Sequence, residues 1–183
     1  MSSSQTLLWT VAAALLFWGV GGYNRLVRMR NAIQQHYAAL DARVLRRNEG
    51  VAALAAALVP LVEPALVDTL QAALGQSQAA RDQARKTPCD ARAITNLGVT
   101  ETVLGDARAR LAGLLGQQGE ALAASSVPAL VDQVAQAETA LGFAREPFNR
   151  AAAEYNAAVR QFPTRLLAAL FGFGAGATLP AQP

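Results

Sequence analysis

The sequence of 183 residues has few of the side chains that catalytic and metal sites require. It contains one cysteine, Cys89, and one histidine, His36. A single cysteine excludes an intramolecular disulfide, and a metal site needs several ligands at suitable spacing. His36 has only Ala and apolar neighbours at helical spacing, and no activating partner accompanies Cys89. Phosphate-binding loops, nucleophile motifs and metal motifs are also missing. We therefore predict a protein that is not an enzyme and that binds no cofactor or metal.

Residues that favour β-sheets are also scarce. Aromatic residues make up 6% of the chain and charged residues 16%, whereas hydrophobic residues, many of them alanine, make up 52%. Strands favour aromatic and β-branched residues, and alanine has the highest intrinsic helix propensity. The composition therefore predicts an all-α protein, long enough for one membrane anchor and one domain.

No charged residue precedes Arg25, and residues 7–20 form an uncharged apolar run. Extended to residue 23, this run is about 18–20 residues long, which is near the lower limit for spanning a bilayer. A secretory signal peptide is the alternative, but such a signal has basic residues before its apolar run. We therefore predict an uncleaved transmembrane helix over residues 1–23. The residues expected at the membrane interfaces are Trp9, Trp18, Tyr23, Arg25, Arg28 and Arg30.

Positive charge is concentrated directly after this run. Residues 23–47 carry six arginines and one acidic residue, Asp41, whereas the rest of the chain has a net charge of −2. The positive-inside rule then predicts an outer N-terminus and a cytoplasmic domain at the bacterial inner membrane. Basic residues at a membrane edge suit anionic lipids at about 1 kcal/mol each. Nucleic-acid binding is not expected, because no stacking aromatics alternate with the basic residues.

Apolar residues recur at heptad spacing through most of the remaining chain. On the first helix they are Leu26, Ile33, Tyr37, Leu40 and Val44, and Arg30 interrupts the pattern. Pro60 and Pro64 predict either a kink or a helix–helix connection over residues 58–64. A second helix is expected over about residues 65–86, and a third after Asp90, a plausible N-cap.

The fourth helix has the most regular pattern and is expected to begin at Val127-Pro128. Its predicted buried positions are Leu130, Val134, Ala137, Leu141, Ala144, Phe148, Ala151, Tyr155, Ala158 and Phe162. Pro147 lies inside this pattern and is expected to bend the helix without ending it. Short loops make successive helices antiparallel neighbours. The predicted architecture is therefore an antiparallel four-helix bundle over residues 24–163, continuous with the anchor.

Residues 164–183 are expected to lie outside the bundle. The apolar stretch 166–173 is too short to span a membrane. Either it contacts the membrane surface or it covers the end of the bundle. The last ten residues, 174–183, are rich in Gly, Ala and Pro and are expected to be disordered.

Two blocks of the sequence resemble the LemA family of bacterial membrane-anchored proteins. The first block contains Tyr23-Asn24-Arg25-Leu26-Val27-Arg28, Arg30-Asn31, Leu40-Asp41 and Arg46-Arg47, and the second contains Ala144-Arg145, Phe148-Asn149, Tyr155-Asn156 and Phe162-Pro163. The family usually has an aspartate after the two arginines, where this chain has Asn48. The resemblance implies a single N-terminal span and a helical bundle, and it implies no catalytic activity. The motif residues taken as candidate partner contacts are Asn24, Arg46, Arg47, Arg145, Asn149, Tyr155, Asn156, Phe162 and Pro163.

Asn149 and Asn156 are of particular interest, because both lie on one edge of the fourth helix. They could bind a partner, or they could form ordinary hydrogen bonds with a neighbouring helix. The preferred hypothesis is a membrane-anchored scaffold or adaptor that forms homo-oligomers or binds a membrane protein. The first alternative is a regulatory subunit of a membrane enzyme such as a protease. The second is a cofactor-binding bundle built around His36.

Overall fold

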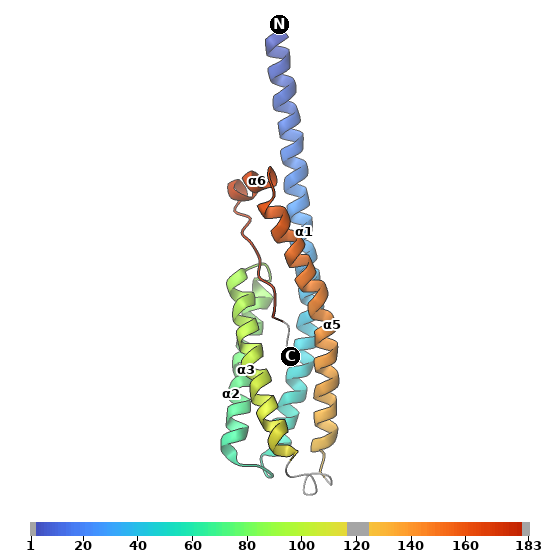
Figure 1. Cartoon of the computed structure of the whole chain (residues 1–183), viewed down its shortest axis with the longest axis vertical. Helices are drawn as coiled ribbons and strands as arrows, with labels where there is room; N and C mark the ends of the chain where they lie inside the picture. Colours follow the sequence, from blue (N-terminus) through green and yellow to red (C-terminus); the bar gives the residue numbers. More distant parts are fainter. Residues whose placement is uncertain (1–2, 117–124, 181–183) are drawn as a thin grey trace.

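The computed structural model describes residues 3–116 and 125–180 of the chain. Within these ranges the helices are α1 (Ser3–Leu58), α2 (Pro64–Lys86), α3 (Ala91–Leu115), α5 (Val127–Arg160) and α6 (Thr164–Phe171). Helices α1, α2, α3 and α5 form an antiparallel bundle, and the N-terminal part of α1 extends beyond it (Figure 1). The predicted all-α fold, with an N-terminal helix continuous with a four-helix bundle, is confirmed.

Helix α1 connects the apolar run to the bundle without a break over 56 residues. The five apolar heptad residues predicted on it, Leu26 to Val44, are all at most 2% exposed. Each faces α5 or the α2–α3 pair, because residues three and four positions apart share one side of a helix. The periodicity of the sequence thus correctly predicted which side of α1 packs.

The predicted helix boundaries follow from proline and capping chemistry. Helix α1 ends at Leu58, before Pro60, and α2 begins at Pro64. Proline is tolerated at the first position of a helix, because the N–H that it lacks would have no acceptor within the helix. The carboxylate of Asp90 accepts a hydrogen bond from the backbone N–H of Arg92 at 3.2 Å, so the predicted N-cap of α3 is confirmed. Helix α5 continues through Pro147 to Arg160.

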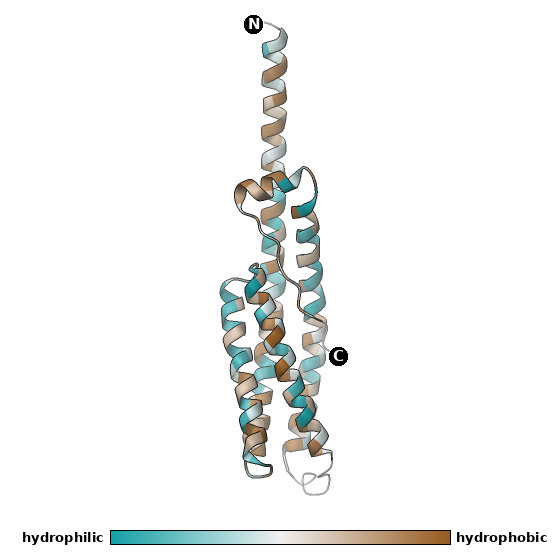
Figure 2. Cartoon of the chain, turned by 60° about the vertical axis from the view of Figure 1, so that its left-hand side comes forward, coloured by the Kyte–Doolittle hydropathy of each residue, from teal (hydrophilic) through white to brown (hydrophobic). Residues whose placement is uncertain are grey.

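The bundle is asymmetric, because α2 and α3 are shorter than α1 and α5 and do not reach the anchor (Figure 1). Its buried apolar residues form two clusters. The distal cluster, far from the anchor, is formed by Val51, Leu54, Leu58, Leu70, Leu104, Leu111, Val134 and their neighbours. The membrane-proximal cluster contains Leu26, Tyr37, Leu97, Phe148, Tyr155, Phe173, Leu179 and their neighbours. Figure 2 shows that hydrophilic and hydrophobic residues alternate along the helices of the bundle.

Two expectations for the C-terminal end are wrong. Phe162 is 71% exposed, because α5 ends at Arg160 and the chain turns there into α6. Residues 174–180 are not disordered but run as an extended segment back along the bundle, as Figures 1 and 2 both show. Its contacts include a buried leucine, Leu179, and hydrogen bonds to α5 that the composition of the segment did not indicate. Residues 181–183 lie outside the described residues.

Candidate functional site

The first part of α1 has the properties of a membrane span. It contains a stretch long and apolar enough to cross a bilayer, and none of that stretch is buried in the bundle. Trp9 is 68% exposed and Trp18 is 39% exposed. Asn24, Arg25 and Arg28 are also exposed, close to the point where the bundle begins at Leu26. The predicted interface residues all lie on α1, where Arg30 is half-buried and the others are exposed. Their place at a membrane interface stays a prediction.

Helix α6 packs across α1 at the end of this apolar stretch. The side chain of Leu167 lies against Gly19 and Gly22, and a Cβ atom at Gly22 would be 2.6 Å from Leu167 Cδ1. Glycine at position 22 therefore permits the close approach of the two helices. The ring of Tyr23 makes edge-to-face contacts with Phe171 and Phe173, at centroid distances of 5.1 and 5.6 Å.

Arg30 joins this junction from the bundle side. Its guanidinium carbon lies 5.6 Å from the centroid of the Phe173 ring, within the range of a cation–π interaction. This contact explains how a charged residue occupies the apolar face of α1 without being buried against other helices. A hollow of about 300 Å³ opens beside it. The lining residues are Tyr23, Val27, Arg30, Asn31, Gln34, Phe171 and Phe173.

The outer face of α6 and the turn before it expose a group of large apolar side chains. The exposed fractions are 71% for Phe162, 57% for Leu166, 75% for Leu170 and 54% for Phe171. Single exposed apolar residues are common on soluble proteins, but a contiguous group usually marks an interaction surface. We name these four residues the α6 apolar face. It lies beside the end of the apolar stretch of α1 (Figure 2).

A buried layer of charged and polar residues separates the two apolar clusters. At its centre is Arg47, whose side chain is fully buried. Its Nη2 donates to both carboxylate oxygens of Glu101 on α3, at 2.6 and 2.8 Å. Its Nε donates to Asn48 Oδ1 at 2.9 Å, and the hydroxyl of Ser77 on α2 donates to Glu101 at 2.8 Å. The layer thus joins α1, α2 and α3 through one buried ion pair.

Helix α5 completes the layer with Glu138 and Arg145. Glu138 accepts a hydrogen bond from Arg108 Nη1 at 2.8 Å and lies 3.6 Å from Arg47 Nη1. Arg145 is buried, and this burial lowers the pKa of its guanidinium, whereas the nearby carboxylates of Glu101 and Glu138 act in the opposite direction. The layer thus contains side chains from all four helices, with three arginines and two glutamates.

Such a layer favours one alignment of the helices over others. A buried ion pair adds little net stability, because desolvation of the charges offsets their attraction. A shifted register would instead leave Arg47 or Glu101 buried without its partner, which is costly. A second pair supports the alignment of α1 and α2, since Arg81 Nε lies 2.7 Å from Asp41 Oδ1.

Sequence reasoning missed most of this layer, although a signal was present. Arg47 lies three residues after Val44, Ser77 lies four after Ala73, and Glu101 lies four after Leu97. Each polar residue therefore occupies a position on an apolar helix face. Three polar residues at such positions on three helices predict a polar layer, provided that the helices align.

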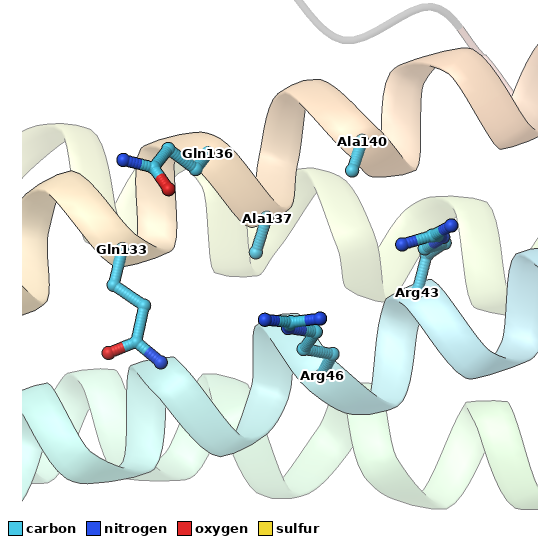
Figure 3. Close-up of a pocket in the computed structure, with 6 residues that line it drawn as sticks. All are labelled: Arg43, Arg46, Gln133, Gln136, Ala137 and Ala140. Carbon is cyan, nitrogen blue, oxygen red and sulfur yellow. The ribbon is translucent and has the colours of Figure 1, made fainter.

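A second hollow lies on the outer surface between α1 and α5 (Figure 3). It measures about 210 Å³ and is lined by Arg43, Arg46, Gln133, Gln136, Ala137 and Ala140. The two arginine side chains come from α1, and the two small alanines of α5 leave the space above them (Figure 3). The hollow has no acidic lining residue. Arg46 is exposed, whereas Arg47 next to it is buried.

The two asparagines on the edge of α5 hold the C-terminal segment. Asn149 accepts a hydrogen bond from the N–H of Leu179 and donates one to its carbonyl, both at 2.8 Å. Asn156 makes the same pair of bonds with Gly176, also at 2.8 Å. These contacts are to an extended segment of the same chain and not to a neighbouring helix, so the expected hydrogen bonds between helices are wrong for these two residues. Binding of a partner by the two asparagines stays a prediction.

The remaining candidates do not assemble into a reactive centre. His36 is exposed, and no group of three or more His, Cys, Asp or Glu within residues 3–116 and 125–180 is placed to hold a metal ion. The thiol of Cys89 lies 3.8 Å from the carbonyl of Arg30. Tyr155 is buried in the membrane-proximal cluster, and burial raises the pKa of its hydroxyl. The predicted absence of catalysis and cofactors remains a prediction.

Comparison with known proteins identifies the family but no individual relative. The model of the LemA family matches residues 36–182, which is most of the chain and includes both the buried layer and the two asparagines. A search of curated proteins gives no match. Because the family match extends from α1 to the C-terminal segment, the chain belongs to the LemA family.

Proposed function

We propose that this protein is a non-enzymatic scaffold of the bacterial inner membrane, which acts through self-association and binding of membrane partners. The observation that carries the proposal is the position of α6. Its apolar face is exposed beside Gly19–Tyr23 of α1, where the apolar stretch ends. A membrane surface at that level would cover exposed apolar side chains on both helices.

In this arrangement α1 crosses the membrane and α6 lies in the interface. Short helices with apolar and basic side chains bind at the boundary between headgroups and acyl chains. Arg165 on α6 and the exposed Arg25 and Arg28 on α1 are suitably placed for anionic headgroups. The positive-inside rule then supports a cytoplasmic bundle. The rest of the bundle presents hydrophilic helix faces to partners (Figure 2).

The contact of α6 with the membrane can be tested with single cysteines in a Cys89→Ser chain reconstituted into vesicles. We expect a polarity-sensitive fluorophore at Leu170→Cys to shift its emission to shorter wavelength on reconstitution. The matched control is Phe143→Cys, because Phe143 on α5 is 77% exposed and Leu170 is 75% exposed. Equal spectra at the two positions would reject the interfacial position of α6.

Orientation and self-association need separate measurements. A cysteine at the exposed Ala65, also in the Cys89→Ser chain, should resist a membrane-impermeant maleimide in intact spheroplasts and react after lysis. The purified chain in detergent should have a mass greater than one copy by light scattering. A monomer that co-purifies with no membrane protein would contradict the scaffold. Capture of one membrane enzyme by in-cell crosslinking, without self-capture, would favour a regulatory subunit.

A further inference from the structure

The hydrogen bonds between α5 and the C-terminal segment have a regular geometry. Asn149 and Asn156 are seven residues apart, which is about 10.5 Å along a helix. Their partners, Leu179 and Gly176, are three residues apart, which is about 10 Å in an extended chain. The two spacings match, so one side of α5 can hold an extended peptide that runs antiparallel to it. We name residues 173–180 the tail segment.

Apolar contacts complete the binding of the tail segment. Leu179 is 4% exposed and Phe173 is 8% exposed, and both belong to the membrane-proximal cluster. A Cβ atom on Gly98 of α3 would lie 2.9 Å from Pro180 Cδ, so glycine at this position makes room for the proline. We name the site formed by Gly98, Asn149 and Asn156 the tail groove. It accepts an uncharged extended peptide with small residues followed by Leu-Pro.

None of these contacts requires that the tail segment belong to the same chain. The asparagines bond to backbone groups. The segment joins α6 through Gly172, whose φ is 69°, and Gly174, where an added Cβ atom would meet no atom within 4 Å. This connection offers little resistance to a change of direction. Exchange of an identical segment between copies preserves every contact and is a common route to dimers.

We propose that the tail groove is a peptide-binding site whose ligand, in the self-associated protein, is the tail segment of a second copy. The unbroken α1 would hold the groove of each anchored copy at one height above the membrane. Tails of neighbouring copies then meet grooves at the same level and at high local concentration, which favours exchange. The proposal rests on the self-association of the proposed function and assigns the segment that mediates it.

The first experiment measures peptide binding to an open groove. The probe is a fluorescent synthetic peptide of residues 174–183, and the protein is the detergent-solubilised chain ending at Phe173. We expect saturable binding that Leu179→Asp in the peptide abolishes. Because each asparagine makes two hydrogen bonds of about 1 kcal/mol, Asn149→Ala in the protein should weaken binding by tenfold or more. Asn96→Ala, a change of an exposed asparagine on α3, should have no effect.

The second experiment tests exchange between copies. A tagged chain ending at Phe173 supplies an open groove, and an untagged full chain with Asn149→Ala and Asn156→Ala supplies a released tail. We expect the mixture to co-purify, and both excess peptide and Leu179→Asp in the untagged chain to prevent it. Circular dichroism checks that each variant keeps the helicity of the wild type.

Each outcome bears on one of the two proposals. Failure of peptide binding, failure of co-purification, or co-purification that Leu179→Asp does not change would overturn tail exchange. If the wild-type chain still forms oligomers in any of these cases, the self-association in the proposed function stands and uses another surface. If the wild-type chain is monomeric as well and co-purifies with no membrane protein, both proposals fail.

Discussion

The two halves of the bundle are closed in different ways. In the distal half, four helices surround the apolar cluster and bury residues such as Leu54, Leu104 and Val134. In the membrane-proximal half, α2 and α3 end early, and the tail segment contributes Phe173 and Leu179 to the cluster. The buried layer around Arg47 separates the two halves. The distal half is therefore closed by helices alone, and the membrane-proximal half by helices together with an extended segment.

This difference affects how each half can open. The distal cluster can be exposed only by separating helices, which breaks the cooperative core of the domain. The membrane-proximal cluster can be exposed in part when the tail segment leaves, which breaks the four hydrogen bonds to Asn149 and Asn156. Regions with few buried contacts open at lower free energy than the core. Local opening is therefore expected first in the half that the tail segment covers.

The largest effect is expected when the layer between the halves is disrupted. Arg47→Ala leaves the Glu101 carboxylate buried without its ion-pair partner. We expect it to lower the free energy of unfolding of the bundle by about 3–5 kcal/mol, measured by circular dichroism in urea. The neighbouring Arg46 is exposed, and Arg46→Ala should change stability by less than about 0.5 kcal/mol.

A double variant sharpens this test. Arg47→Met with Glu101→Leu replaces the ion pair by apolar side chains, and we expect most of the lost stability to return. The double variant should also allow alternative helix alignments, seen as broadened NMR signals. Equal stability of Arg47→Ala and Arg46→Ala would refute the role of the layer.

A smaller effect should distinguish the two apolar clusters directly. Leu104 and Leu179 are 0% and 4% exposed, one in each half. Leu104→Ala creates a cavity among helices and should cost about 2–5 kcal/mol of unfolding free energy. Leu179→Ala should cost roughly half of that or less, since the tail segment can detach while the helices stay folded. Hydrogen exchange at the Gly176 amide should increase in Leu179→Ala and not at helix amides of the distal half. If both variants lowered the free energy of unfolding by the same amount, the proposed difference between the two halves would be wrong.

The smallest effect is expected at the junction of α6 with α1. Gly22→Val places a side chain against Leu167, whereas a Cβ atom added at Gly21 would meet no atom within 4 Å. We expect Gly22→Val to loosen α6 and to increase tryptic cleavage after Arg165 several-fold, with little change in unfolding free energy. Gly21→Val has the same change in size and helix propensity and serves as the control. Cleavage at equal rates would show that α6 is not held by this contact.

Much of the bundle was predictable because its determinants are local. Heptad spacing identified the buried face of α1, and Pro64, Asp90 and Val127 marked the helix ends. The prediction was wrong at Phe162, because α5 ends at Arg160, two residues before the heptad pattern ends. The sequence predicts that Pro147 bends the helix without ending it. The structure shows that α5 continues through Pro147.

The parts that were not predicted depend on contacts between distant segments. Glu101 pairs with Arg47, 54 positions away. Helical spacing predicts that Glu101 lies on the buried face of α3, but it does not predict which residue it contacts. The tail segment has the composition of a disordered chain. It is ordered because Asn149 and Asn156 bond to its backbone. Hydrogen bonds to backbone groups do not require particular side chains, so the sequence of the segment does not indicate them.

The continuity of α1 has a mechanical consequence. About 35 residues separate Tyr23 from Leu58, which corresponds to a length of about 50 Å of helix. α1 has no break along that length. In the proposed arrangement, a tilt of the apolar stretch in the bilayer would therefore move the Leu58 end of the helix as a rigid lever, and a partner that contacts that end would have to reach about 50 Å from the lipid surface.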